Sequence, residues 1–463
     1  MFTDQWGGDI YSLTPEERAE GSKPKYAIIS AVYLEDQISY KGININPGVR
    51  IDVFDPSTTY RTNPADASSP DRKTASIKVQ FNPRLYISYP VGDRSFFSIA
   101  YGWYTQVPRF SLVYNNMVSA LTRGNNIVGN PDLRPENTKQ YNVAYNVQLS
   151  DDYALDVQAF YKDIYGLTGL AYIPDNRFPY ALVSNGEYGN ARGIEITFRK
   201  RLTGNFGFNV NYTLSFAQGT SSSPGANYNV ILAGADPFTG VRQFPLTEYP
   251  LDYDRRHRFN YIIDFVWGKG EGPSIGGIHF LENFAVNFTG LFQTGTPYTR
   301  LDLRGNQIGD FNAERQPSVW TLDMRLQRTL PLRELFGESF GSSELIFFLD
   351  VFNLPNLTGP VSVYPRTGDP DNDGVSLYRQ PGDFPAGPWY ARPDPANPAT
   401  IAQSQYDRTG KRLYTEAADL NHDGIVTQQE QFQSYLQYVN DAISRRPLYQ
   451  FPRTVFFGMM LRF

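Results

Sequence analysis

The sequence lacks cysteine altogether and contains only three histidines, His257, His279 and His422. Without thiols, the chain can form no disulfide and no cysteine-based zinc or iron–sulfur site. Three imidazoles are too few for a histidine-rich catalytic metal centre. Motifs of the G-x-S-x-G, H-E-x-x-H and P-loop types are also missing. These absences indicate a protein that is not an enzyme.

Three further features limit the location and partners of the chain. No apolar run approaches the 18 or so residues that a membrane-spanning helix requires, and the mean hydropathy is −0.42. Residues 1–21 lack the basic and apolar regions of a secretory signal peptide. We therefore expect a mature form, a truncated form or the C-terminal part of a longer chain. The net charge of −5 gives no basic footprint for nucleic acid.

The chain is instead rich in aromatic residues, with 32 Tyr and 32 Phe, and in alternating segments. Over residues 76–89, 140–149, 205–216 and 453–463, apolar side chains recur at every second position. Strands have this period, so each segment has one apolar face, opposite a face that is polar in the first three segments. The strands expected on this basis are 25–40, 43–54, 76–89, 94–104, 138–149, 153–165, 187–201, 205–217, 256–267, 282–293, 317–329, 343–354 and 453–463.

The connections between these strands alternate in length. One set is tight, with two later members that are somewhat longer, at about 268–281 and 330–342. The other set is long: about 55–75, 105–137, 166–186, 218–255, 294–316 and 355–452. Tight turns at one end and long loops at the other are typical of outer-membrane β-barrels, whose apolar face meets lipid. A soluble sandwich, the alternative, has no reason to sort its loops.

We therefore predict an all-β fold, an antiparallel transmembrane β-barrel in the bacterial outer membrane with its long loops extracellular. Thirteen strands is an odd number, whereas bacterial single-chain barrels have even numbers. A closed barrel would then need strands beyond those counted, which agrees with the expectation of a longer chain.

Several motifs together carry a family resemblance. The segment Gly129–Thr138 (GNPDLRPENT) precedes an alternating strand, and the chain ends on Phe463. The other stretches are Pro47–Phe54, Tyr101–Pro108, Asp252–His257 and Asp350–Leu354. In this order they resemble TonB-dependent outer-membrane receptors, most closely those of the Oar-like, carboxypeptidase-regulatory-like kind.

The resemblance implies a barrel of about 22 strands with a plug domain inside it, energised through a TonB-box segment near the N-terminus. This chain would hold strands 10 to 22. The plug, the TonB box and the first nine strands would come from a missing N-terminal region or a second chain. The TonB complex would act through that region, and outer-membrane lipid would surround the barrel.

Two of the motifs have structural explanations. In Asn130–Glu136, Pro131 and Pro135 stiffen a loop that enters a strand, and Asn130 and Asp132 favour turns. We favour a structural role for this motif over ligand contact. The Asp252–His257 stretch is interpreted in the same way, with His257 as a rim residue rather than a catalyst.

The last long loop contains a complete D-x-[DN]-x-[DN]-G-x5-E calcium motif at residues 419–430. Calcium prefers six to eight oxygen ligands, Gly424 allows the sharp turn, and Glu430 would be bidentate. Apolar residues from Phe432 to Ile443 have helical spacing, as expected of an exiting helix. The alternative is a polar surface turn that matches by accident. The predicted calcium ligands are Asp419, Asn421, Asp423, Ile425 (through its carbonyl), Thr427 and Glu430.

A second stretch of this loop, Asp369–Gly374, carries the first half of the same motif. Asp369, Asp371 and Asp373 would supply oxygens, but position twelve is Gln380, which cannot provide a bidentate carboxylate. We predict a partial calcium loop or part of another oxygen cage.

These features divide the chain into four regions. We expect an N-terminal extension (1–24), barrel strands and loops (25–355), a long extracellular loop with a small helical calcium insertion (356–452) and a final strand (453–463). The predicted function is TonB-dependent uptake of a nutrient through the outer membrane. The alternative is a structural or adhesive surface protein with a calcium-ordered loop. The sequence does not identify substrate-binding residues.

Overall fold

The computed structural model describes residues 24–64, 71–115, 126–173, 180–226, 247–302, 305–374, 380–384, 418–444 and 448–463. The expected N-terminal extension, residues 1–24, lies outside the described residues except for Pro24. The chain forms two compact units. Unit 1 comprises residues 1–297, 320–354 and 454–463, and unit 2 comprises residues 298–319 and 355–453.

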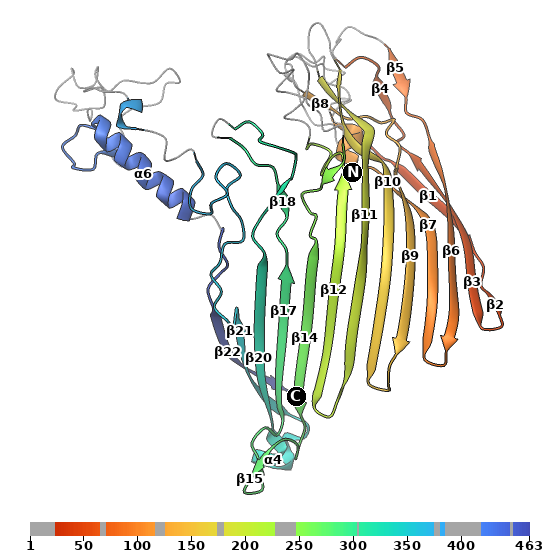
Figure 1. The fold of residues 1–463 in the computed structure, drawn as a ribbon, viewed down its shortest axis with the longest axis vertical. Coiled ribbons are helices and arrows are strands. Elements are labelled where there is room, and N and C mark those ends of the chain that lie inside the picture. Colours follow the sequence, from red (N-terminus) through yellow and green to blue (C-terminus); the bar gives the residue numbers. More distant parts are fainter. Residues whose placement is uncertain are drawn as a thin grey trace. The chain divides into compact units, whose positions relative to one another are not determined.

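One antiparallel sheet dominates unit 1 (Figure 1). Its main strands pair in the order in which they follow one another in the sequence. They are β1 (Ile28–Glu35), β3 (Ile43–Asp55), β6 (Lys78–Gly92), β7 (Ser95–Gln106), β9 (Glu136–Gln148), β10 (Tyr153–Ile173), β11 (Tyr180–Thr203), β12 (Phe206–Gly219), β14 (His257–Trp267), β17 (Phe284–Gln293), β20 (Val319–Pro331), β21 (Glu344–Phe352) and β22 (Thr454–Arg462). The thirteen predicted strands are therefore confirmed, because hydrophobic alternation reports strands directly.

Short strands and helices complete the described secondary structure. Next to the main sheet lie β2 (Ile38–Tyr40), which pairs with β3, β8 (Asn126–Val128), which runs parallel to β11, and β13 (Tyr249–Pro250), which pairs with β12. The small two-stranded sheets are β4 (Thr59–Arg61) with β5 (Arg72–Thr74), β15 (Ser274–Ile275) with β16 (Ile278–His279), and β18 (Pro297–Tyr298) with β19 (Glu314–Arg315). The helices are α2 (Phe110–Tyr114), α4 (Leu332–Phe336), the 3-10 turns η2 (Glu338–Phe340) and η3 (Pro381–Asp383), and α6 (Gln428–Ser444).

The structure corrects one predicted loop. We expected a long connection over residues 166–186, but β10 and β11 continue into it and remain paired as far as Ile173 and Tyr180. Register shifts interrupt the pairing between Tyr165 and Gly169, and Gly166 has a φ of +66°. Such bulges break the period of two, so alternation does not reveal the continuing strands. The predicted first strand is likewise divided into β1 and β2.

The apolar face of the sheet is exposed and polar side chains on the other face are buried, which is the reverse of the pattern in a water-soluble sheet. Val79 and Phe81 on the apolar face of β6, and Ile77 just before the strand, are each 61% exposed. On the opposite face, Lys78 is only 7% exposed and Asn82 only 1%. A water-soluble sheet would bury the apolar face, so this one requires an apolar solvent such as lipid.

Loop segments pack over the polar face at the end of the sheet that carries the long connections. There a core cluster joins Phe54 of β3, Val113 and Tyr114 of α2, Leu133 and Val183 of β11. Tyr114 also donates its hydroxyl proton to the carbonyl of Pro56 (2.8 Å). These long connections therefore have a core of their own, which fixes the loop that carries the GNPDLRPENT motif.

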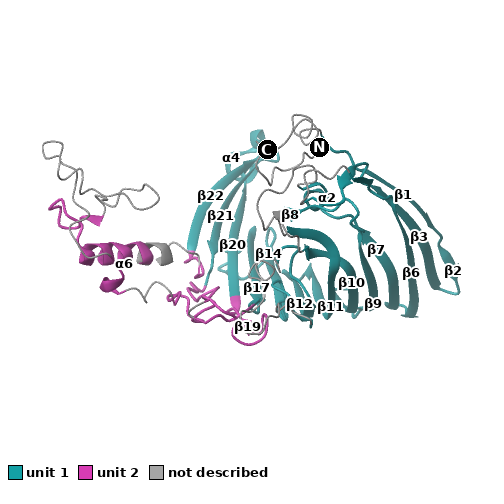
Figure 2. Cartoon of the chain, turned by 90° about the horizontal axis from the view of Figure 1, so that it is seen from above, with its two compact units in different colours: residues 1–297, 320–354, 454–463 teal, residues 298–319, 355–453 magenta. Residues whose placement is uncertain are grey.

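Among the described residues, the sheet of unit 1 has two edge strands. Seen from above, its strands follow one another along a curved wall from β2 and β1 to β22 (Figure 2). Among the described residues, β1 pairs only with β3, and β22 pairs only with β21. Within these ranges, β1 and β22 are therefore the edge strands of the sheet.

Unit 2 consists of the 298–319 connection and the last long loop. An isolated bridge joins Pro360 to Tyr449, and Phe384 packs on Phe432 and Tyr435 of α6. α6 confirms the predicted exiting helix. Across the described ranges, no helix has the length and apolar character needed to cross a membrane.

Candidate functional sites in the loops

Asp132 of the GNPDLRPENT motif is the centre of a polar junction at the long-loop end of unit 1. Its carboxylate accepts hydrogen bonds from the Tyr60 hydroxyl, the Lys73 Nζ (2.9 Å) and both the backbone nitrogen and hydroxyl of Ser76 (2.8 and 2.9 Å). The buried Lys78 adds an ion pair at 3.1 Å and also donates to the carbonyl of Pro131 (2.9 Å). We call these five residues, Tyr60, Lys73, Ser76, Lys78 and Asp132, the Asp132 junction.

Burial alone would raise the pKa of Asp132, but the hydrogen bonds from Ser76, Tyr60 and Lys73 outweigh it. They hold the pKa of this carboxyl far below its usual range. Asp132 is therefore an anion at neutral pH, and it holds its cationic and hydroxyl partners in place.

The neighbouring motif residues attach the same loop to β11. The Asn130 side chain donates to the carbonyl of Val183 (3.0 Å) and accepts from the backbone of Asp132 (2.9 Å). Asn185 bonds both the backbone nitrogen and the carbonyl of Arg134 (2.8 and 2.9 Å). These contacts support the structural interpretation of the motif. Sequence reasoning missed the partners of Asp132, because they lie 54 to 72 residues away along the chain.

The Asp252–His257 stretch also makes contacts of a structural kind. Asp254, 1% exposed, accepts from the backbone of Ala217 (2.7 Å) and from Nε of Arg256 (3.0 Å). His257 Nδ1 lies 2.9 Å from the hydroxyl of Tyr212 on the adjacent strand. The stretch thus joins the start of β14 to β12, as expected of a rim.

The predicted calcium loop, residues 419–430, folds as a compact turn before α6. Asp419 and Glu430 are buried (2% and 8% exposed). Asp419 Oδ2 accepts from the nitrogen of Gly424 (2.9 Å), and Asp423 Oδ1 accepts from that of Ile425 (2.7 Å). The left-handed φ values of His422 (+60°) and Gly424 (+86°) produce the sharp turn.

Glu430 bonds to its own loop in this structure. Its carboxylate accepts from the backbone and hydroxyl of Thr427 (2.8 and 2.7 Å) and from the backbone of Asn421 (3.3 Å). The bonds from Thr427 lower its pKa. Within the described ranges, no three His, Asp or Glu side chains form a group that could hold a metal by themselves. The predicted set therefore also depends on the neutral oxygens of Asn421, Ile425 and Thr427, and its donor chemistry is the hard oxygen that calcium prefers.

A tyrosine donates a hydrogen bond to the second acidic stretch, Asp369–Gly374. Asp371 Oδ1 accepts from the hydroxyl of Tyr449 (2.6 Å), and Asp369 Oδ1 accepts from the backbone of Asp371 (2.8 Å). Asp371 raises the pKa of Tyr449 to about 12 through this hydrogen bond. Gln380 caps η3 with its backbone nitrogen on Asp383 (2.7 Å).

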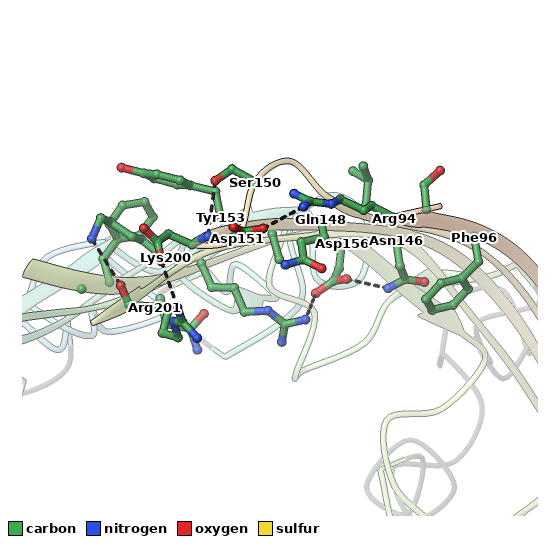
Figure 3. Close-up of a pocket in the computed structure, with 18 of the residues that line it drawn as sticks. Arg94, Phe96, Asn146, Gln148, Ser150, Asp151, Tyr153, Asp156, Lys200 and Arg201 are labelled. Carbon is green, nitrogen blue, oxygen red and sulfur yellow. Dashed lines mark hydrogen bonds and ion pairs between the residues drawn. The ribbon is translucent and has the colours of Figure 1, made fainter. Parts of the chain in front are cut away.

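A concavity of about 900 Å³ lies on unit 1 where the tight turns meet the strands (Figure 3). Asp156 stands between Asn146 (2.6 Å) and Arg199 (3.1 Å), and Arg94 pairs with Asp151 (2.8 Å). Sequence reasoning did not single out this site, although polar residues at alternate strand positions were a signal for it. The ion pairs Asp156–Arg199 and Arg94–Asp151 are compatible with a surface of the sheet that faces water.

A protein-family match covers most of the chain. The family described as "TonB dependent receptor-like, beta-barrel" matches residues 3–354. A search of curated proteins finds no match. Similar solved structures include the FrpB iron transporter from Neisseria meningitidis, with 14% identity over 74% of this chain and 44% of that one and a TM-score of 0.47.

Two other similar structures have comparable values. The ferric enterobactin receptor PfeA from Pseudomonas aeruginosa, solved as a mutant, is 14% identical over 78% of this chain and 44% of that one, with a TM-score of 0.48. The ferric-catecholate import receptor Fiu from Escherichia coli K12 is 16% identical over 73% and 42%, with a TM-score of 0.44. The chain spans less than half the length of each of these proteins.

Proposed function

Because the chain belongs to the TonB-dependent receptor-like β-barrel family, an outer-membrane family of transporters rather than enzymes, we propose that it is part of a receptor that takes up a nutrient with energy from TonB. The observation that carries the proposal is the family match over residues 3–354. The inverted burial of the sheet supports it, since a barrel in lipid places its apolar face outward. The family match also favours transport over the adhesive alternative.

The edge strands of the described sheet, β1 and β22, support a second part of the proposal. A backbone group left unpaired inside the hydrocarbon region costs several kcal/mol, so a closed barrel would place a further strand beside each of them in the membrane. We assign those strands, the plug and the TonB-contacting segment to a longer form of this polypeptide or to a second chain. The intact mass of the native protein, with cross-linking from β1 and β22, distinguishes these two sources.

The transport proposal can be tested by depletion of a defined medium. Strains lacking this gene or TonB should both leave the same compound in a mixture of iron chelates, oligosaccharides and peptides, whereas the parent strain removes it. Restoring the intact gene should restore depletion. A mutant that removes every compound as fast as its parent, while the TonB mutant fails to do so, would overturn the proposal.

We also propose that calcium binds residues 419–430 and orders the last extracellular loop. The complete motif, the two left-handed residues of its turn and the helix that follows support this. Asp419, Asn421, Asp423 and Glu430 would hold the ion through side chains and Ile425 through its carbonyl. Thr427 would contact it directly or through water.

Calorimetric titration of the native protein with CaCl₂ tests the calcium proposal. Binding should weaken strongly in the Glu430→Gln variant, which loses the bidentate carboxylate. The Gln429→Glu variant is a matched control with a neighbouring change of charge, and it should bind normally. Equal heats in the parent and Glu430→Gln proteins would exclude this site. The stretch with Asp369, Asp371 and Asp373 stays a prediction.

A further inference from the structure

Two of the connections at the tight-turn end, here the periplasmic end, are longer than the others and fold into small structures. The first, residues 268–283, contains the β15–β16 hairpin, and the second, residues 332–343, contains α4 and η2. Both lie at the lower end of the strands in Figure 1. Their length exceeds what is needed to join neighbouring strands, for which Lys41-Gly42 suffices between β2 and β3.

Both connections present large apolar side chains to the outside. In the hairpin, Ile275 and Ile278 are 75% and 73% exposed. They are direct cross-strand partners, so their side chains share one face. Gly276 and Gly277, both with positive φ, make the two-residue turn between them. The sequence thus builds a tight tip that displays two isoleucines.

The second connection adds aromatic and aliphatic surface. Phe336 is 65% exposed, Leu335 56% and Phe340 42%, and the rings of Phe336 and Phe340 are 5.5 Å apart. We call the whole exposed set the apolar foot. It consists of Ile275, Ile278, Phe280, Leu335, Phe336 and Phe340.

One ion pair links the two connections, and each connection makes a further polar contact. Lys269 Nζ pairs with Glu334 Oε1 at 2.6 Å, which links the first connection to α4. Glu271 accepts from the Asn205 side chain (2.6 Å) in the next turn along the sheet, and Arg333 pairs with Glu338 at 2.6 Å. The apolar side chains are therefore presented by a braced structure, and four of the nearby charges are paired.

The first of the two connections meets the lipid-facing surface of the wall at Trp267. Trp267 follows Phe265 on the apolar face of β14, with ring centroids 6.1 Å apart, and Phe265 stacks on Phe206 at 5.0 Å. The first connection packs on this tryptophan, since a Cβ at Gly272 would lie 3.1 Å from its ring. Tryptophan is enriched where a membrane meets water.

We propose that the apolar foot inserts into the interfacial region of the inner leaflet of the outer membrane. Large exposed apolar surface mostly marks an interaction site, and the occupant here is lipid because the surface extends from a wall that already faces lipid. Side chains that lie in the headgroup and acyl boundary would anchor this side of the wall at a fixed depth.

Spin labelling tests the proposal, and the cysteine-free sequence makes it direct. The native protein would be reconstituted in vesicles of phosphatidylcholine and phosphatidylglycerol and labelled at Ile278→Cys or Phe336→Cys. The matched control is Asp93→Cys, in the exposed tight turn between β6 and β7. Ile275→Cys is a second hairpin position in case one variant folds poorly.

We expect the foot labels to collide with oxygen several-fold more often than with a water-soluble nickel chelate, and the Asp93→Cys label to show the reverse. Foot labels that behave like the control would place the foot in water and overturn the proposal. Foot labels shielded from both reagents would show that protein covers the surface, and they would overturn it as well.

Discussion

The Asp132 junction and the predicted calcium loop are both built around aspartate in a long loop, yet their carboxylates find partners at very different distances along the chain. Asp132 bonds to residues 54 to 72 positions away. In residues 419–430, the carboxylates of Asp419, Asp423 and Glu430 accept bonds from backbone groups two to nine positions away. Long-range bonds make a loop part of the global fold, whereas short-range bonds organise only the loop itself.

This difference indicates which interactions keep each region ordered. The Asp132 junction contains its own cations, Lys73 and Lys78, and a hydrophobic cluster lies under it. The 419–430 loop gathers acidic side chains with no Lys or Arg of its own. We therefore expect the first region to be stable without added ions and the second to depend on a cation.

The largest effect should follow from Asp132→Ala. The substitution leaves the buried Lys78 ammonium without its carboxylate, which typically costs about 3–5 kcal/mol. Urea unfolding of the native protein in detergent should show the loss. Glu430→Ala in calcium-free buffer is the control, because the bonds of Glu430 are local, and it should leave the midpoint unchanged. If the two variants had equal midpoints, the comparison would fail.

The next largest effect should follow from calcium removal. At a calcium concentration of 100 times Kd, the bound ion stabilises its site by about 2.7 kcal/mol. A chelator should therefore raise the fraction of molecules in which this loop is open roughly 100-fold. Protease cleavage within residues 360–450 should accelerate, while cleavage near residues 55–75 should not. The Glu430→Gln protein should be cleaved quickly with or without chelator. An unchanged cleavage rate in the parent protein would contradict the prediction.

A smaller effect should appear with pH at Asp132. Its folded-state pKa is lowered, so its contribution to stability is complete above the unfolded pKa, about 3.9, and decreases as the pH falls toward the folded pKa. The stability gap between the parent and Asp132→Asn proteins should be constant from about pH 8 to 5 and shrink below about 4. If the difference in stability between the two proteins already disappeared near pH 6, Asp132 would be excluded as its source.

The smallest effect should come from Gln380→Glu in the second acidic stretch. The change supplies the carboxylate missing from position twelve, so calorimetry should detect one additional weak calcium equivalent. Gln380→Ala is the control and should add none. If both variants match the parent, the stretch is not a calcium loop of this kind.

Sequence reasoning succeeded where the signal is periodic or local. Alternation revealed every main strand, because each apolar side chain facing lipid is two positions from the next. It failed beyond Tyr165, where Gly166 and the register shifts change the faces of β10. The motif at residues 419–430 was readable because its spacing is contained in twelve positions. The partners of Asp132 were not readable, since they depend on the packing of separate loops.

The position of β1 and β22 at the edges of the described sheet has a practical consequence for anyone who produces this chain alone. Edge strands are templates for pairing with another chain, so β22 of one molecule can dock against β1 of another, and each addition presents a new edge. Such head-to-tail contacts produce open-ended ribbons unless the rotation closes a ring. Purified material should therefore lengthen with concentration, and supplying the complementary strands should stop its growth.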